Sequence, residues 1–272
     1  MIITPILLHR NNLAAYDRHM SAADIPMQSP PRSRPHPVWH EAADAHVLAG
    51  LLAAWVAERL REGLTQRGQA TLVVSGGSTP VPFFHALRVA ELDWSRVTVT
   101  LADERAVPIA HTDSNARLVC NHLLQERAAQ ARWLPCFAAA PQPDQLAQDC
   151  AALEARLAAL AWPVDAVVLG MGADGHTASL FPRSAELREA LGADGHRHCL
   201  IAEAPPAPNV PVRRLSWTPQ ALLATRHLAI HTTGAAKREL LQRACVSSDV
   251  LEMPIRLALW QEQVPCHLFH AD

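Results

Sequence analysis

Long apolar runs are absent from this sequence of 272 residues: no stretch approaches the roughly 18 consecutive apolar residues that a membrane-spanning helix needs. An excess of charge of either sign is also absent, because 24 Lys and Arg residues face 26 Asp and Glu residues. With a formal net charge of −2, we expect neither a nucleic acid nor a membrane as a partner. The motifs GxSxG, HExxH and Walker A are missing too, which argues against the enzyme classes that they mark.

Paired cysteines are missing as well. The six cysteines lie far apart and form no CxxC pair, which is typical of free, mostly structural thiols in a reducing compartment. We therefore expect a cytoplasmic protein. The 15 histidines are scattered without the spacing of metal ligands, so we expect no metal and no cofactor. The cysteines are Cys120, Cys136, Cys150, Cys199, Cys245 and Cys266.

The N-terminal part of the chain differs from the rest. Its apolar start lacks the basic region of a signal peptide, and the proline-rich stretch from Gln28 to Pro37 is typical of a linker. The remainder is long enough to bury a substantial core, with a hydrophobic share of 49% for the whole sequence. We expect residues 1–35 to be a flexible extension and residues 36–272 to form a single α/β domain.

Apolar segments of two kinds alternate along residues 36–272. Short, branched runs indicate buried strands, and longer Ala/Leu-rich runs at helical spacing indicate helices. This alternation predicts a doubly wound, mainly parallel sheet with helices on both faces, similar to a Rossmann fold. We expect helices at 41–63, 80–89, 115–127, 146–161, 234–245 and 255–260, and strands at 71–75, 97–102, 165–169, 199–203, 227–230 and 267–270.

A glycine-rich run follows one of these strands. Three glycines in six residues, starting at Gly170, allow a tight turn at the carboxyl end of the strand, where open α/β sheets bind their ligands. Asp174 and His176 lie in this turn. Since an imidazole has a pKa near 6.5, His176 is suited to act as a general base at neutral pH, with Asp174 holding the ring in the required tautomer. A structural loop histidine is the competing interpretation.

A second loop joins the strand at 71–75 to the next helix. Its backbone N–H groups and the start of that helix favour an anion such as a phosphate monoester, and two hydroxyl groups add donors. A plain turn capped by Thr79 is the alternative. The residues expected to bind phosphate here are Gly76, Gly77, Ser78 and Thr79.

The run from Gly170 to Pro182 closely resembles the signature of the 6-phosphogluconolactonases, which belong with the glucosamine-6-phosphate isomerase/deaminase group. Four other segments resemble family blocks in the same order, and the resemblance covers roughly Val38 to the C-terminus. It implies hydrolysis of 6-phospho-D-glucono-1,5-lactone, with this sugar-phosphate lactone as the partner. For the assembly we expect either a monomer or a homodimer. The four other blocks are Leu72–Pro80, Leu101–Pro108 with Asp113–Asn115, Arg214–Thr218 and Gly234–Lys237.

The resemblance also implies roles for charged residues outside the two loops. It places Lys237 and Arg214 on the substrate phosphate and Arg105 in contact with the substrate. Because Arg213 is adjacent to Arg214, the phosphate contact could belong to either of these two arginines. Asp103 is assigned to the substrate site with them. Asp103 and Glu104 both follow a strand, and for both a capping or ion-pairing role remains open beside a catalytic one.

Two alternatives to a lactonase remain. The deaminases of the same group carry a Glu five residues after the corresponding His, whereas Phe181 stands there, and they have an aromatic residue where Arg105 stands. Both differences favour the lactonase over an isomerase or deaminase. A sugar-phosphate sensor on the same scaffold, without catalysis, would be expected to carry a basic helical DNA-binding domain, which the sequence lacks.

Overall fold

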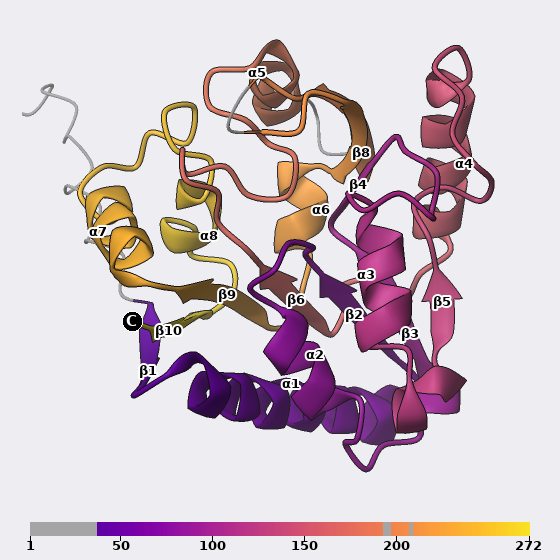
Figure 1. The fold of residues 1–272 in the computed structure, drawn as a ribbon, viewed down its shortest axis with the longest axis vertical. Coiled ribbons are helices and arrows are strands. Elements are labelled where there is room, and N and C mark those ends of the chain that lie inside the picture. The colour runs from indigo at the N-terminus through magenta and orange to yellow at the C-terminus, as the bar shows by residue number, and fades with distance from the viewer. Residues whose placement is uncertain (1–36, 193–196, 207–208) are drawn as a thin grey trace, which may run out of the picture. The chain divides into compact units, whose positions relative to one another are not determined.

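A seven-stranded parallel sheet forms the centre of the computed structural model, which describes residues 37–192, 197–206 and 209–272 (Figure 1). Its strand order is β1-β10-β9-β6-β2-β3-β5, and every neighbouring pair is parallel. This confirms the prediction of a mainly parallel α/β fold. The strands are β1 (Val38–Ala42), β2 (Ala70–Val74), β3 (Val97–Leu101), β5 (Arg132–Leu134), β6 (Ala166–Leu169), β9 (Leu228–Thr233) and β10 (Cys266–Ala271). The extension expected at residues 1–35 lies outside the described residues.

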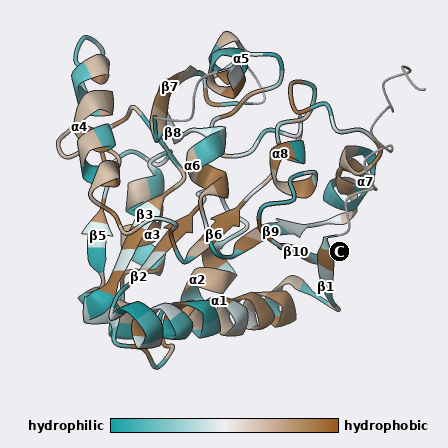
Figure 2. Cartoon of the chain, turned by 180° about the vertical axis from the view of Figure 1, so that it is seen from behind, coloured by the Kyte–Doolittle hydropathy of each residue, from teal (hydrophilic) through white to brown (hydrophobic). Residues whose placement is uncertain are grey.

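Helices flank this sheet. The long helix α1 packs against strands β1, β2, β6 and β10, below the sheet in Figure 1, while α6, α7 and α8 lie above it. Figure 2 shows hydrophobic residues concentrated on the central strands, and every residue of β2 and β6 is buried. The helices are α1 (Ala45–Arg67), α2 (Val81–Leu87), α3 (Asn115–His122), α4 (Leu146–Ala158), α5 (Ala185–Gly192), α6 (Pro219–Leu223), α7 (Ala235–Ala244) and α8 (Arg256–Leu259), with 3₁₀ turns at Trp94–Arg96 and Glu126–Gln130.

A second, antiparallel sheet was not predicted. Its order is β4-β8-β7, and its strands are β4 (Asp103–Arg105), β7 (Cys199–Glu203) and β8 (Arg213–Trp217). Only the strand at 199–203 was expected, and it was assigned to the parallel sheet. Because β4 begins two residues after β3 ends, the chain passes from the carboxyl edge of the large sheet directly into the small one.

The first helix differs from its expected span of 41–63. The side chain of Asp44 accepts hydrogen bonds from the backbone N–H groups of His46 and Val47, at 2.8 and 2.9 Å, so the helix begins after β1. It continues past Gly63 and ends at Gly68, whose φ of 74° is left-handed. Gly63 is required for another reason: a Cβ there would lie 2.5 Å from Oδ1 of Asp165.

Other elements keep their type but are shorter or slightly displaced. The helix expected to run to Arg127 ends at His122, and a separate 3₁₀ turn follows. The helix expected at 80–89 spans only seven residues, with Pro80 at its N-cap. The short strands β1, β4, β5 and β8 were missed because three to five residues, several of them charged, show no clear alternation.

Candidate active site

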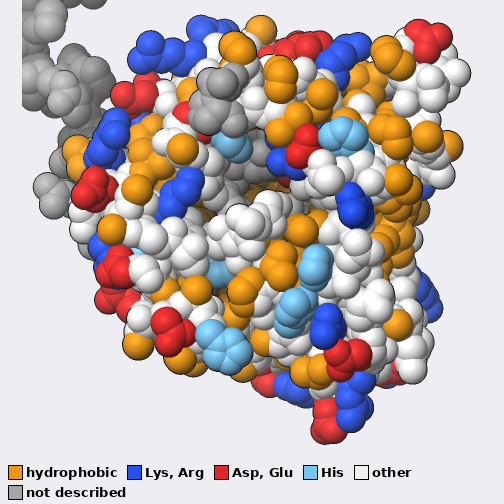
Figure 3. Space-filling model, viewed as in Figure 1, with side chains coloured by type: hydrophobic (Ala, Val, Ile, Leu, Met, Phe, Trp, Pro, Cys, Tyr) orange, Lys and Arg blue, Asp and Glu red, His pale blue; other side chains and the backbone are white. Residues whose placement is uncertain are grey.

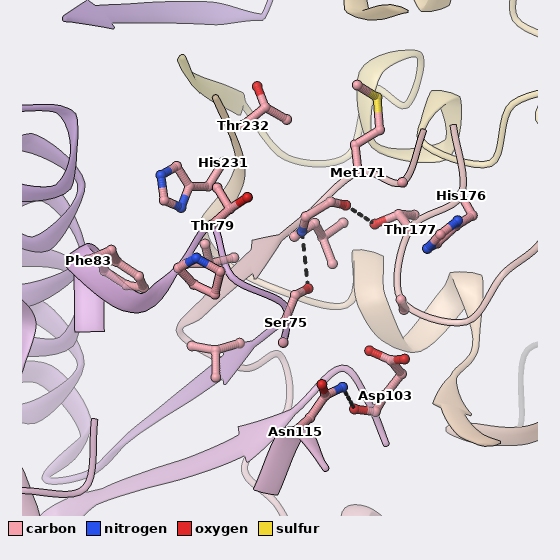
Figure 4. Close-up of a pocket in the computed structure, with 18 of the residues that line it drawn as sticks. Ser75, Thr79, Phe83, Asp103, Asn115, Met171, His176, Thr177, His231 and Thr232 are labelled. Carbon is pink, nitrogen blue, oxygen red and sulfur yellow. Dashed lines mark hydrogen bonds between the residues drawn. The ribbon is translucent and has the colours of Figure 1, made fainter. Parts of the chain in front are cut away.

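A cleft of about 140 Å³ opens at the carboxyl ends of β2, β6 and β9, where the parallel sheet meets the small sheet (Figure 4). Most of the sequence-predicted site residues line it, although they come from segments up to 161 positions apart in the chain (Gly76 to Lys237). Figure 3 shows that Lys and Arg side chains are spread over this face of the molecule among acidic ones. The charged side chains that line the cleft are the cations Arg105, Arg214 and Lys237 and the carboxylate of Asp103. The sequence-predicted residues that line the cleft are Gly76, Thr79, Asp103, Arg105, His176, Arg214 and Lys237.

The loop after β6 holds His176 in one orientation. Oδ1 of Asp174 lies 2.6 Å from Nδ1 of His176 and also accepts the backbone N–H of His176 at 3.1 Å. The loop can bring these groups together because Gly175 has a left-handed φ of 85°. Gly172 is needed for space, since a Cβ there would lie 2.1 Å from the His176 ring.

The electrostatics of this pair suit proton transfer. Burial raises the pKa of Asp174, but the hydrogen bonds and charge of His176 outweigh it and lower this pKa to about 2. Asp174 is thus ionised at neutral pH and favours a proton on Nδ1 of His176. Within the described part of the chain, Nε2 of His176 has no hydrogen-bond partner, and in Figure 4 the ring reaches towards the cleft. An imidazole held in this way can accept a proton at Nε2.

The loop after β2 is joined to the loop after β6. The backbone N–H of Gly170 donates to Oγ of Ser75 at 3.1 Å, and Gly76 lies so close to Asn115 that a Cβ would be 1.9 Å from Oδ1 of that side chain. Of the four predicted phosphate-binding residues, Gly76 and Thr79 line the cleft. The other two, Gly77 and Ser78, are not among the lining residues.

Asp103 and Arg214 form a buried charged pair at the wall of the cleft. Oδ2 of Asp103 accepts a hydrogen bond from Oγ of Ser179 at 2.5 Å and lies 3.7 Å from Nη1 of Arg214. The guanidinium of Arg214 also lies over the Phe181 ring, 5.2 Å from its centroid. Burial lowers the pKa of Arg214, although the charge of Asp103 opposes this. Nε of Arg214 is buried and has no partner within the described residues.

The neighbouring arginine on β8 takes a different position. Arg213 is exposed and pairs with Glu203 on the adjacent strand, with 2.7 Å between Nε and Oε1. Because side chains alternate along a strand, Arg214 faces inwards and Arg213 faces outwards. Of the two arginines between which the sequence could not decide, Arg214 is the one that lines the cleft.

Glu104 and Arg105 have separate partners. The carboxylate of Glu104 accepts hydrogen bonds from the backbone N–H groups of Asn115 and Ala116, at 2.9 and 2.6 Å, and thus caps α3. Burial raises the pKa of Glu104, and these bonds oppose the rise. Arg105 does not pair with Glu104 through its guanidinium; its Nη1 donates to the carbonyl of Asp113 at 2.7 Å.

Lys237, the sole lysine in the sequence, lies in the first turn of α7. Its Nζ donates a hydrogen bond to the carbonyl of Met171 at 2.7 Å, which places the ammonium group beside the loop that carries His176. Burial lowers the pKa of Lys237, and the charge of Asp174 opposes this change. The ammonium group keeps donors for a ligand in the cleft.

Sequence reasoning missed three residues of this region. Ser179 supports Asp103, Asn115 packs against Gly76, and His231 lines the cleft from β9. Burial lowers the pKa of His231 to about 4, so this side chain is neutral at neutral pH. A signal was available for His231, a polar residue directly after the apolar run 228–230, which is unusual in a buried strand.

The described residues contain neither a metal-binding cluster nor a membrane-spanning helix. No group of three or more His, Cys, Asp or Glu side chains in ranges 37–192, 197–206 and 209–272 is arranged to hold a metal ion. No helix in these ranges has the length and apolar character needed to cross a membrane.

The fold and the cleft define an α/β protein in which a His–carboxylate pair lies beside cationic side chains at the carboxyl edge of a parallel sheet. The chain belongs to the family of glucosamine-6-phosphate isomerases and 6-phosphogluconolactonases, whose sequence pattern matches residues 43–266.

Named relatives agree with this assignment. The chain is 47% identical to a 6-phosphogluconolactonase of Pseudomonas putida over 81% of its own length and 88% of the relative. It is 44% identical to one from Rhizobium meliloti (strain 1021), over 85% and 97% of the two chains. A crystal structure of a 6-phosphogluconolactonase from Shewanella baltica OS155 superposes with a TM-score of 0.81 at 37% identity, covering 87% of this chain and 98% of that one.

Proposed function

We propose that this chain is a metal-independent 6-phosphogluconolactonase, which hydrolyses 6-phospho-D-glucono-1,5-lactone to 6-phospho-D-gluconate in the oxidative pentose phosphate pathway. The 2.6 Å contact between Asp174 and His176, with Nε2 unbonded by the described residues and facing the cleft, is the observation that carries the proposal. The relatives that carry the lactonase name over most of the chain support the choice of substrate. The cysteine usage supports a cytoplasmic location.

In this mechanism His176 activates water. Nε2 takes a proton as the water oxygen bonds to the lactone carbonyl carbon, and the carbonyl electron pair moves to its oxygen. The tetrahedral intermediate then collapses, the bond to the ring oxygen breaks, and His176 returns the proton to that oxygen. Asp174 stabilises the imidazolium between the two steps, because its carboxylate stays ionised at neutral pH.

The phosphate group would lie among the cations of the cleft. Lys237 and Arg214 supply fixed positive charge, and the backbone at Gly76 with the hydroxyl of Thr79 supplies neutral donors. Arg105, which is anchored by the carbonyl of Asp113, is suited to a substrate hydroxyl or phosphate oxygen. Asp103 contributes by holding Ser179 and Arg214 in place.

An isomerase or deaminase needs a proton-transferring side chain for ring opening, and position 181 does not provide one. Phe181 stands five residues after His176, where the deaminases carry a Glu, and its side chain is buried with its ring centroid 5.0 Å from that of His176. A phenyl ring transfers no proton. The structure thus favours hydrolysis over sugar isomerisation at this site.

A direct assay tests the function. Purified protein treated with EDTA should accelerate hydrolysis of the phosphorylated lactone, measured as acid release after subtraction of the spontaneous rate. The same preparation should release no ammonia from glucosamine 6-phosphate. Ammonia release without lactone hydrolysis would contradict the proposal, and activity that returns only with an added divalent cation would contradict its metal independence.

A further inference from the structure

Two cysteines outside the catalytic cleft lie in contact. Cys150 is on α4 and Cys199 begins β7, 49 positions later in the sequence, and their Sγ atoms are 3.4 Å apart. A disulfide bond is about 2.0 Å long, so the two sulfur atoms need to approach by roughly 1.4 Å to form one. Both are free thiols in the structure.

The pair lines a second cleft of about 440 Å³, between α4, α5 and β7. Among the residues that the structure describes, none that lines this cleft also lines the catalytic one. Cys150 is half-buried, which leaves its sulfur within reach of a small reagent, whereas Cys199 is buried behind it. The two thiols therefore differ in access, as an attacking and a resolving cysteine do.

A carboxylate fixes the two elements that carry these thiols. Glu154, one turn after Cys150 on α4, accepts hydrogen bonds from the backbone N–H groups of His198 and Cys199 at 2.9 and 3.0 Å. Its Oε1 also lies 2.6 Å from Nδ1 of His198. Since these contacts hold the start of β7 against α4, the proximity of the sulfur atoms is built into the fold.

The charges around the pair distinguish the two sulfur atoms. The hydrogen bond with Cys199 lowers the pKa of the Cys150 thiol, and the nearby charge of Arg197 lowers it further, while burial opposes both. The same hydrogen bond, followed by burial, raises the pKa of Cys199. Cys150 is thus the sulfur that loses its proton first and becomes the nucleophile.

We propose that Cys150 and Cys199 form a site of reversible oxidation that a peroxide converts to an intramolecular disulfide. The Cys150 thiolate attacks one peroxide oxygen and the O–O bond breaks, which gives a sulfenic acid. The leaving hydroxide combines with the proton that the Cys150 thiol released and becomes water. Cys199 then gives its proton to Glu154 and its Sγ attacks Sγ of Cys150. The S–O bond breaks, and the leaving hydroxide takes that proton from Glu154 and becomes water. Two thiols lose two electrons, and one hydrogen peroxide becomes two water molecules.

The bond would tie α4 to the small sheet. Cys199 is paired with Trp217 in the register of β7 and β8, and β8 also carries Arg214. The site remains separate from the proposed catalytic chemistry, because neither thiol lines the catalytic cleft. The proposal can therefore be tested by detecting the disulfide itself, without measuring lactone hydrolysis.

Peptide mapping of the full chain tests the proposal. Reduced, folded protein is exposed to stoichiometric hydrogen peroxide, alkylated under denaturing conditions and cleaved with trypsin. The expected product is a disulfide that joins peptide 133–156 to peptide 198–213 and disappears on reduction with dithiothreitol. Loss of this thiol pair should be about tenfold faster than loss of the half-buried Cys120, because the partner sulfur is already in place.

Two variants make the assignment specific. Peptide 133–156 also contains Cys136, so Cys136→Ala should keep the cross-link and Cys150→Ser should abolish it. Cys150→Ser changes a half-buried position, and circular dichroism shows whether it is folded. A cross-link that survives in Cys150→Ser, or peroxide treatment that leaves both thiols alkylatable in the folded wild-type protein, would overturn the proposal.

Discussion

Asp174 and His176 are two positions apart, and a single carboxylate oxygen contacts the histidine twice. Oδ1 lies 2.6 Å from Nδ1 and accepts the backbone N–H at 3.1 Å. Because both contacts end on one atom, the orientation of the ring is set by the loop before any substrate arrives. This preorganisation connects the glycine-rich sequence to the proposed proton transfer.

The ionisation of Asp174 should stabilise the fold in a pH-dependent way. Its folded pKa of about 2 lies below its ordinary 3.8, so its contribution is complete well above pH 4 and is lost as the pH falls through 2. Asp174→Asn should lower the free energy of unfolding by at most about 2 kcal/mol at pH 7, and by about half as much at pH 3. Urea unfolding at both pH values measures this difference.

The exposed Asp144→Asn variant is the control for that series and should change the unfolding free energy little at either pH. If Asp174→Asn lowers the free energy of unfolding by the same amount at pH 7 and at pH 3, the carboxylate does not stabilise the fold through its charge.

Gly172 should be required for catalysis although it carries no functional group. A Cβ at this position would lie 2.1 Å from the His176 ring, so Gly172→Ala should displace the imidazole and reduce kcat by roughly 10²-fold, since a misplaced catalytic group loses that much. Gly50→Ala is the matched control, because no atom lies within 4 Å of a Cβ there. Near wild-type kcat in Gly172→Ala would mean that the ring position is unimportant.

Lys237 should act on binding more than on chemistry. A charge-assisted hydrogen bond to phosphate contributes roughly 1.5–3 kcal/mol, so Lys237→Ala should raise KM for the phosphorylated lactone by about 10- to 100-fold. Turnover of unphosphorylated gluconolactone should barely change. Arg243→Ala, at the exposed far end of the same helix, should leave both substrates unaffected. Equal losses on both substrates would assign Lys237 to folding or catalysis.

Elements with strong local signals were predictable from the sequence. Strand 199–203 was predicted with its observed bounds, and the strand before the glycine-rich run was predicted to within one residue. The boundary at Gly63 was wrong, because this glycine permits a close approach of Asp165 and does not end the helix. That function depends on a residue about 100 positions away, which local patterns do not contain.

In the candidate site, too, local features were predictable from the sequence, whereas contacts between distant residues were not. His176 and Asp174 come from one loop, so the sequence already places them together. Whether Arg213 or Arg214 faces the cleft depended on the register of β8, a strand too short and too charged to be predicted. The support of Asp103 by Ser179 joins residues 76 positions apart, and only the folded chain brings them together.

Removal of the N-terminal segment tests the expected domain boundary. A protein starting at His36 retains β1 and should keep its lactonase activity and a Tm within about 2 °C of the full chain, a shift that corresponds to under roughly 1 kcal/mol. A protein starting at Ala45 should be clearly less stable, since it loses the pairing of β1 with β10 and the stacking of His40 on Phe269 at 4.3 Å. If the protein starting at His36 is inactive or destabilised, the domain begins before residue 36.

His176 is proposed to be the general base of lactone hydrolysis. The most direct measurement is kcat of the His176→Ala variant on the phosphorylated lactone, corrected for spontaneous hydrolysis, together with the affinity of the variant for 6-phosphogluconate. We expect a loss of roughly 10²–10⁴-fold in kcat with nearly unchanged affinity. A variant that binds equally well and keeps a kcat within a factor of about three of wild type would contradict it, because such a small change is below the contribution of a general base.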